Sequence, residues 1–217
     1  MNERISLDKR FLITGLLVVF TVLFLGLFSQ SDKVNPVFQT FLVSLTFFLV
    51  VPMLYCKIIL KEPLKNIGWQ TGRIFPGMFF SIISVSVALA IIFALDRYTS
   101  FGTGYTLSYT IQSNFLWFLL YEALLVPFMA LLYEVFFRGL VQRLWLSSFG
   151  LVAVFIQAFL FVGLLFLADD LSWQRVPALI FSLFSGLIVY YSGSLWYAWG
   201  ASWFFYFLID MFRLVLH

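Results

Sequence analysis

The sequence has one cysteine and one histidine, and each scarcity argues against a class of site. Cys56 alone cannot form an intramolecular disulfide. His217 is the last residue, so no internal histidine can build a zinc-binding H-E-x-x-H helix. At the chain end it is also a poor base for Ser–His or Cys–His catalysis. We therefore expect neither a metal ion nor a cofactor.

Charge is scarce as well. Asp, Glu, Lys and Arg make up 11% of the 217 residues, and the formal net charge is only +3. The 13 Lys and Arg are scattered, whereas a nucleic-acid-binding protein needs them clustered on one face. No phosphate-binding G-x-x-x-x-G-K motif is present. Nucleic acid is therefore not an expected partner.

What the sequence has is apolar length. Hydrophobic residues make up 63% of the chain, far more than in a soluble domain. Seven apolar windows reach or approach the roughly 20 residues that span a bilayer. They predict an all-α, polytopic transmembrane helix bundle with about seven spans, surrounded by the lipid bilayer. The windows are 11–29, 37–60, 74–95, 115–145, 149–168, 176–192 and 195–216.

The fourth window, 115–145, is too long for a simple span. Pro127 lies inside it and predicts a kink or a break, because proline removes a backbone donor. Whether these residues form one helix or two stays open at this point.

The N-terminal segment predicts a retained helix. Its apolar run of 18 residues, 11–28, is longer than the core of about 7–15 residues in a cleaved signal peptide. The distribution of Lys and Arg then favours a cytoplasmic N-terminus, with nine on the inside and four on the outside. The low charge, the abundant Phe and the retained N-terminal helix fit an inner (plasma) membrane. The inside residues are Arg4, Lys9, Arg10, Lys57, Lys61, Lys65, Arg73, Arg138 and Arg143, and the outside residues are Lys33, Arg97, Arg175 and Arg213.

Charged residues inside apolar windows are candidates for a functional site. Glu134 and Arg138 are spaced i, i+4, share a helix face and are predicted to form a structural ion pair. Glu122 lies twelve residues before Glu134, about 120° around an ideal helix, so the two acids need not form a carboxylate pair. Asp210 and Arg213 are expected to pair with each other near the end of the last window.

Three segments resemble motifs of the CPBP superfamily, which includes the CAAX prenyl endopeptidases and the bacterial Abi and bacteriocin-immunity proteins. Y-E-V-F-F-R-G (133–139) resembles the family's E-E-x-x-x-R-G, and F-V-G-L-L (161–165) stands where the family has F-x-x-x-H. S-G-S-L-W-Y-A-W-G-A-S-W-F-F-Y (192–206) resembles s-G-s-l-W-x-x-x-x-x-H-x-x-x-N. K-E-P-L-K-N-I-G-W (61–69) resembles the basic stretch that precedes the family core.

The resemblance implies a domain organisation. No linker, low-complexity tract or long repeat divides residues 1–217, so we expect a single transmembrane domain. Within it the resemblance implies a CPBP-like core over 60–210. Two additional transmembrane helices in 1–59 would precede that core.

The chain departs from the family motifs at the acid–base positions. The family's water-activating Glu aligns with Tyr133, and a tyrosine with a pKa near 10 is a poor base at neutral pH. The family's two His align with Leu165 and Ser202, and its Asn aligns with Tyr206. We expect a degenerate active site with no catalytic residue. Its positions are Tyr133, Glu134, Arg138, Phe161, Leu165, Ser202 and Tyr206.

These departures favour a catalytically inert protein that acts as a binding, scaffold or accessory subunit of a membrane protein complex. Its partner would be a membrane or envelope protein, bound by the Tyr-rich segment 96–114 or by small lipid-facing residues such as Gly186 and Gly200. The resemblance leaves two alternatives. One is a bacteriocin-immunity protein, and the other is an intramembrane peptidase that uses Glu134 as its base.

Overall fold

The computed structural model describes residues 7–30 and 35–216, and this part of the chain is helical with no strand. Arg4, Lys33 and His217 lie outside the described residues. The first elements in chain order are α1 (Leu7–Gly26), α2 (Pro36–Leu45), η1 (Thr46–Val50), α3 (Val51–Leu54), η2 (Tyr55–Ile59), η3 (Leu64–Ile67), α4 (Ile74–Tyr98), α5 (Phe101–Gly104) and α6 (Tyr109–Ser113). The remaining elements are α7 (Phe115–Leu120), η4 (Tyr121–Leu125), α8 (Val126–Tyr133), η5 (Glu134–Gln142), α9 (Arg143–Phe149), α10 (Val152–Leu167), η6 (Trp173–Arg175), α11 (Val176–Ser192) and α12 (Leu195–Leu216).

All seven apolar windows are helical. Four helices among the described residues are long and apolar enough to cross a membrane, and two apolar helices are shorter. The prediction of an all-α, polytopic bundle is confirmed, and the chain is a multi-pass membrane protein. The long helices are Phe38–Ile59, Ile74–Tyr98, Phe115–Phe149 and Trp173–Ser192, and the shorter ones are Phe11–Gly26 and Val152–Leu167.

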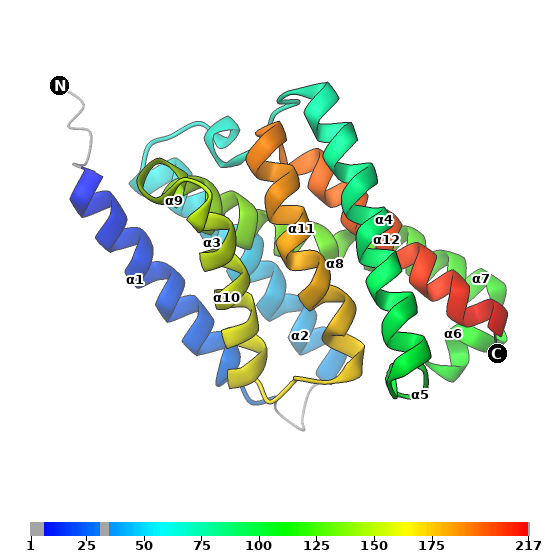
Figure 1. Cartoon of the computed structure of the whole chain (residues 1–217). Helices are drawn as coiled ribbons and strands as arrows, with labels where there is room; N and C mark the ends of the chain where they lie inside the picture. Colours follow the sequence, from blue (N-terminus) through cyan, green and yellow to red (C-terminus); the bar gives the residue numbers. More distant parts are fainter. Residues whose placement is uncertain (1–6, 31–34, 217) are drawn as a thin grey trace.

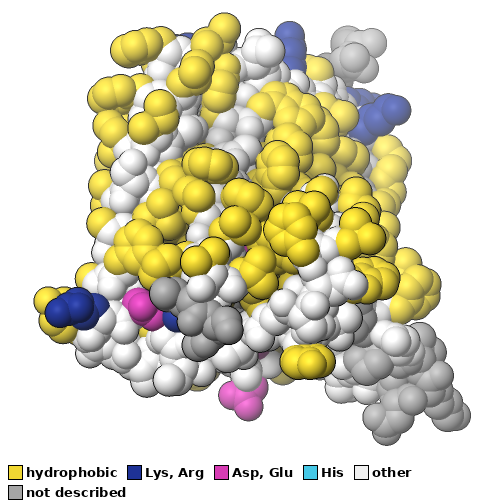
Figure 2. Space-filling view, turned by 90° about the vertical axis from the view of Figure 1, so that its right-hand side faces the viewer, with side chains coloured by type: hydrophobic (Ala, Val, Ile, Leu, Met, Phe, Trp, Pro, Cys, Tyr) yellow, Lys and Arg dark blue, Asp and Glu magenta, His cyan; other side chains and the backbone are white. Residues whose placement is uncertain are grey.

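The surface carries the apolar band that lipid requires. Large apolar side chains stay exposed along the helices, as Leu16, Ile82 and Phe159 do at 69%, 65% and 74%. On the face drawn in Figure 2, hydrophobic side chains cover the middle, and the charged side chains lie toward the top and the bottom. This separation fits a bilayer core flanked by polar interfaces.

The fourth window forms one continuous helix of 35 residues, Phe115–Phe149, through α7, η4, α8, η5 and α9. Two stretches of it are π-helical, with backbone bonds from i to i+5. The first comes just before Pro127, whose nitrogen has no hydrogen to donate to the carbonyl of Glu122, five residues earlier. The Trp203 indole donates to that carbonyl instead, at 2.7 Å. Pro127 therefore changes the helix locally without breaking it.

Helix α11 occupies the middle of the core. It packs against α4, α10 and α12 (Figure 1). The long helix packs against α12 through α8 and against α10 through η5. Helix α1 packs on α10 at the edge of the bundle. Side chains from α8, η5, α10, α11 and α12 therefore meet in the interior. The division into an N-terminal helix pair and a CPBP-like core stays a prediction.

Residues 61–73, which precede α4 and include the basic segment 61–69, are hydrogen-bonded to the turn between α11 and α12. Gly193, with a positive φ of 74°, ends α11 and reverses the chain. The Arg73 amide donates to the Ser192 carbonyl at 2.7 Å, and the Leu195 amide donates to the Gly68 carbonyl at 2.9 Å. These bonds join residues 68–73 to the start of motif 192–206, and the bond from Leu195 positions the first turn of α12.

Candidate functional site

The seven predicted site positions come from three helical regions that meet in the core. Tyr133 ends α8, Glu134 and Arg138 lie in η5, and the other four positions lie on α10 and α12. A cavity of about 30 Å³ is lined by every predicted position except Leu165. Leu165 lines an adjoining cavity of about 400 Å³, which shares Tyr133, Phe161 and Tyr206 with the smaller one. The structure thus brings all seven positions together around two neighbouring cavities.

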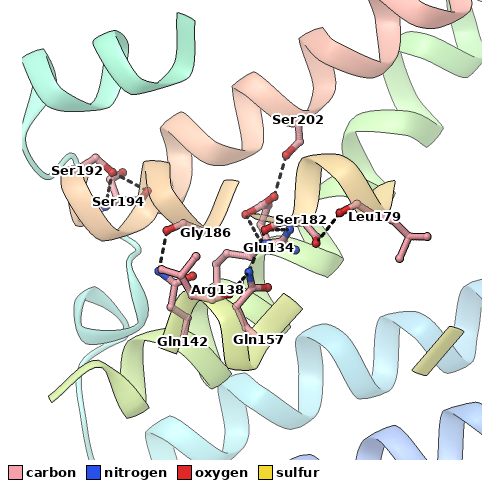
Figure 3. Close-up of polar contacts among 11 residues, drawn as sticks. Glu134, Arg138, Gln142, Gln157, Leu179, Ser182, Gly186, Ser192, Ser194 and Ser202 are labelled. Atoms are coloured by element: carbon pink, nitrogen blue, oxygen red, sulfur yellow. Dashed lines mark hydrogen bonds and ion pairs between the residues drawn. The ribbon is translucent and has the colours of Figure 1, made fainter. Parts of the chain in front are cut away.

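Glu134 has two polar neighbours in the small cavity (Figure 3). The Ser202 hydroxyl donates to Glu134 Oε1 at 2.8 Å. Arg138 Nε lies 3.6 Å from Glu134 Oε2, close enough for an ion pair but too far for a good hydrogen bond. Both side chains are at most 5% exposed. Glu134 Oε2 and Arg138 Nε have no hydrogen-bond partner within the described residues.

A row of polar side chains extends from this site along η5. Arg138 Nη2 donates to the Ser182 carbonyl at 3.0 Å, and Gln142 Nε2 donates to the Gly186 carbonyl at 2.8 Å (Figure 3). Gln157 from α10 donates to the same Ser182 carbonyl at 2.9 Å. Sequence reasoning missed both glutamines. The signal for Gln142 was the i, i+4, i+8 spacing of Glu134, Arg138 and Gln142, which places three polar side chains on one helix face.

Gly186 is buried in α11, so the prediction that it faces lipid is wrong. A Cβ atom there would lie 2.8 Å from Gln157 Nε2 and 2.9 Å from Val154 Cγ1. The polar row leaves no space for a side chain at this position. At Gly200, by contrast, an added Cβ would meet nothing within 4 Å.

A second polar cluster lies farther along the same helices, with Asp210 two helical turns after Ser202 on α12 and Glu122 about three turns before Glu134. The Tyr105 hydroxyl donates to Asp210 Oδ1 at 2.6 Å. The Glu122 carboxyl group lies beside that of Asp210. Glu122 is 2% exposed and Asp210 is 1% exposed. Burial and the nearby Asp210 carboxylate raise the pKa of Tyr105 well above its usual value, so its hydroxyl keeps the proton that it donates.

The predicted pair between Asp210 and Arg213 is wrong. Arg213 instead forms an ion pair with Asp96, near the end of α4. The two residues leave α12 in different directions, because Asp210 points toward the cavity and Arg213 toward α4. Sequence reasoning also missed that Asp210 lies beside Glu122. The available signal was the i, i+4, i+8 spacing of Ser202, Tyr206 and Asp210, which puts all three on one face of α12.

The chemistry open to the first site is limited. Its cavity of about 30 Å³ is large enough for one water molecule but not for a peptide. Glu134 is the carboxylate that lines it, and the two family histidine positions hold Leu165 and Ser202. In the described part of the chain, no group of three or more His, Cys, Asp or Glu side chains is placed to hold a metal ion.

The family comparison agrees with the motifs. Residues 112–208, a little under half of the chain, match the family model of the type II CAAX prenyl endopeptidase Rce1-like proteins. The chain carries an Rce1-like segment. The predicted resemblance to the CPBP superfamily is therefore confirmed. The matched segment includes all seven predicted site positions as well as Glu122, and it excludes the basic connector 61–69.

Comparisons with curated proteins and with solved structures gave no match.

Proposed function

We propose that this protein is a catalytically inert, CPBP-like membrane protein that acts by binding, as a scaffold or accessory subunit of a membrane protein complex. The surroundings of Glu134 carry this proposal. Its carboxylate accepts a hydrogen bond from the Ser202 hydroxyl and faces the Arg138 guanidinium in a small cavity. Residues 7–30 and 35–216, which the structure describes, contain no imidazole to move a proton. In this proposal, Glu134 and Arg138 form a structural ion pair that holds η5 against α11 and α12.

We place the protein in an inner (plasma) membrane with a cytoplasmic N-terminus, following the Lys and Arg distribution. The partner would be another membrane or envelope protein. Segment 96–114 is the proposed contact surface. Tyr98 and Tyr109 are 81% and 83% exposed there, whereas Tyr105 is buried. Exposed tyrosines suit such a surface, because they bury a large ring and keep a polar hydroxyl.

Purification from native membranes in a mild detergent, with mass spectrometry of stoichiometric companions, tests this proposal. We expect one reproducible companion. The double variant Tyr98→Ala and Tyr109→Ala should lose it. The matched control Phe159→Ala removes an equally exposed aromatic ring on α10 and should keep it. A wild-type protein that always purifies alone would contradict the scaffold proposal.

One observation favours a peptidase as the second candidate. Glu134 Oε2 has no hydrogen-bond partner within the described residues, and the cavity beside it has room for one water molecule. Glu134 would then activate that water. If Glu134→Gln abolishes cleavage of membrane-derived peptides at constant protein level, the inert assignment is wrong. Asp169→Asn, at an exposed loop position, is the control and should not affect cleavage.

A further inference from the structure

Glu122 and Asp210 form a buried acidic pair that the proposed function does not use. The two carboxyl groups lie beside each other, where they can share one proton. Asp210 also receives a hydrogen bond from Tyr105. No N–H or O–H group of another described residue donates to either oxygen of Glu122 in the hydrogen bonds found. With one proton shared, the pair still carries one negative charge and has no cation beside it.

The nearby cations are engaged elsewhere. Arg213, one turn from Asp210, pairs with Asp96. Arg175 lines the large cavity but pairs with Asp170 at 2.6 Å. A buried negative charge without a counter-charge is costly, so a bound group that supplies a positive charge would stabilise the pair.

The large cavity gives such a group a place to bind. Its volume of about 400 Å³ falls in the range of small-molecule sites. Asp210 lies in its wall, and Glu122 stands one helical turn before Val126, another wall residue. Four tyrosines line the cavity, and apolar side chains make up much of the rest of its wall. The tyrosines are Tyr105, Tyr121, Tyr133 and Tyr206, and the apolar residues include Leu107, Ile111, Leu125, Met129 and Leu165.

We propose that this cavity binds an organic cation: a protonated amine that carries an aromatic or short aliphatic body. The ammonium group supplies the positive charge that the pair lacks, and it can donate hydrogen bonds to the Asp210 carboxylate in the cavity wall. Tyrosine rings in the same wall favour a cation by their π faces. The apolar wall receives the body of the ligand. Residues 105–108 and η6 contribute to the cavity wall. This inference does not depend on the proposed protein partner.

Thermal unfolding of the purified full-length protein tests the proposal, with phenethylamine as the probe and phenethyl alcohol as its uncharged counterpart. A ligand that binds the folded state raises the melting temperature. We expect phenethylamine to raise it in a saturable way, with an apparent affinity at least about tenfold above that of the alcohol. Equal effects of the two compounds, or no effect of either, would overturn the proposal.

Variants assign the effect to the acidic pair. Glu122→Gln and Asp210→Asn keep the side-chain shapes and should each weaken phenethylamine binding by at least about tenfold. Asp169→Asn also removes one negative charge, but from an exposed loop, and should leave binding unchanged. Unchanged binding in both cavity variants would disprove this site. If those variants do not fold, the comparison of amine with alcohol on the wild-type protein still decides the question.

Discussion

At the residue scale, the candidate site holds a buried carboxylate, Glu134, with two polar neighbours. Ser202 donates a hydrogen bond to Glu134 but, unlike the histidine of the family motif, cannot exchange a proton near neutral pH. The Arg138 Nε atom lies 3.6 Å from Glu134 Oε2, and Arg138 also donates a hydrogen bond to the Ser182 carbonyl of α11. The contacts that remain fit a structural role for Glu134 better than a chemical one.

The ion pair leads to a stability prediction. Arg138→Leu would leave Glu134 buried without its cation, and we expect it to lower the free energy of unfolding by about 3–5 kcal/mol. The double variant Glu134→Gln with Arg138→Met removes both charges and should cost clearly less. Chemical unfolding in detergent measures both. Identical losses in the single and double variants would mean that the two side chains do not interact.

Gly186 leads to a second prediction. Gly186→Ala would push a Cβ atom against Gln157 and Val154, and this overpacking should cost about 1–3 kcal/mol. Gly163→Ala on α10 is the matched control. An added Cβ there meets nothing within 4 Å, so alanine should be neutral or stabilise the helix by up to about 1 kcal/mol. The melting temperatures of the two variants should therefore move apart, and equal shifts would show that α10 and α11 do not pack this closely.

At the scale of elements, the long helix Phe115–Phe149 and α12 are joined by tryptophans. The Trp199 indole donates to the Pro127 carbonyl, and the Trp203 indole donates to the Glu122 carbonyl, each at 2.7 Å. In the bilayer a backbone carbonyl has no water to bond, so the one that Pro127 leaves without a donor needs a side-chain donor. The tryptophans of α12 thus stabilise the π-helical turn.

This arrangement predicts a coupling between Pro127 and Trp203. Trp203→Phe should cost about 1–3 kcal/mol, because the Glu122 carbonyl loses its donor. Pro127→Ala restores a backbone N–H five residues after Glu122. In that background the same Trp203→Phe change should cost less, which a double-mutant cycle detects as a coupling energy. Additive effects of the two changes would contradict the proposed exchange of donors.

At the scale of the whole molecule, the long helix determines how the chain crosses the membrane. Its 35 residues form one pass, so α6 and the end of α9 should lie on opposite sides. Segment 96–114 precedes this helix and contributes part of the wall of the large cavity. The predicted orientation would place this segment outside the cell and the end of α9 in the cytoplasm.

Cysteine labelling tests this topology. In a Cys56→Ser background, a membrane-impermeant maleimide added to intact cells should label Tyr109→Cys, which replaces an exposed residue of α6. Ser147→Cys, near the exposed end of α9, should react only after the membrane is opened. The Cys56→Ser parent should stay unlabelled. Labelling of both positions from outside would mean that the long helix does not cross the membrane.

Much of the architecture follows from the sequence alone. Hydrophobic length and composition predict helices and membrane residence, because bilayer thickness imposes a local requirement on each segment. Motif spacing also identified the positions that meet at the site, such as Tyr133 and Ser202, since positions on facing helices keep their register when individual residues change. The continuity of the helix through Pro127 could not be predicted. The hydrogen-bond donor that replaces the missing N–H of Pro127 is the Trp203 indole, which lies on another helix.

Only the tertiary structure decided which polar groups meet across helices. Sequence spacing paired Asp210 with Arg213, but the fold places Asp210 beside Glu122 and Arg213 beside Asp96. It also buries Gly186 against Gln157. The physical reason is that helix periodicity assigns each residue a face but does not say which helix packs against that face. The sequence by itself determined a membrane-embedded helical protein with altered CPBP motifs, and packing alone created the acidic cavity.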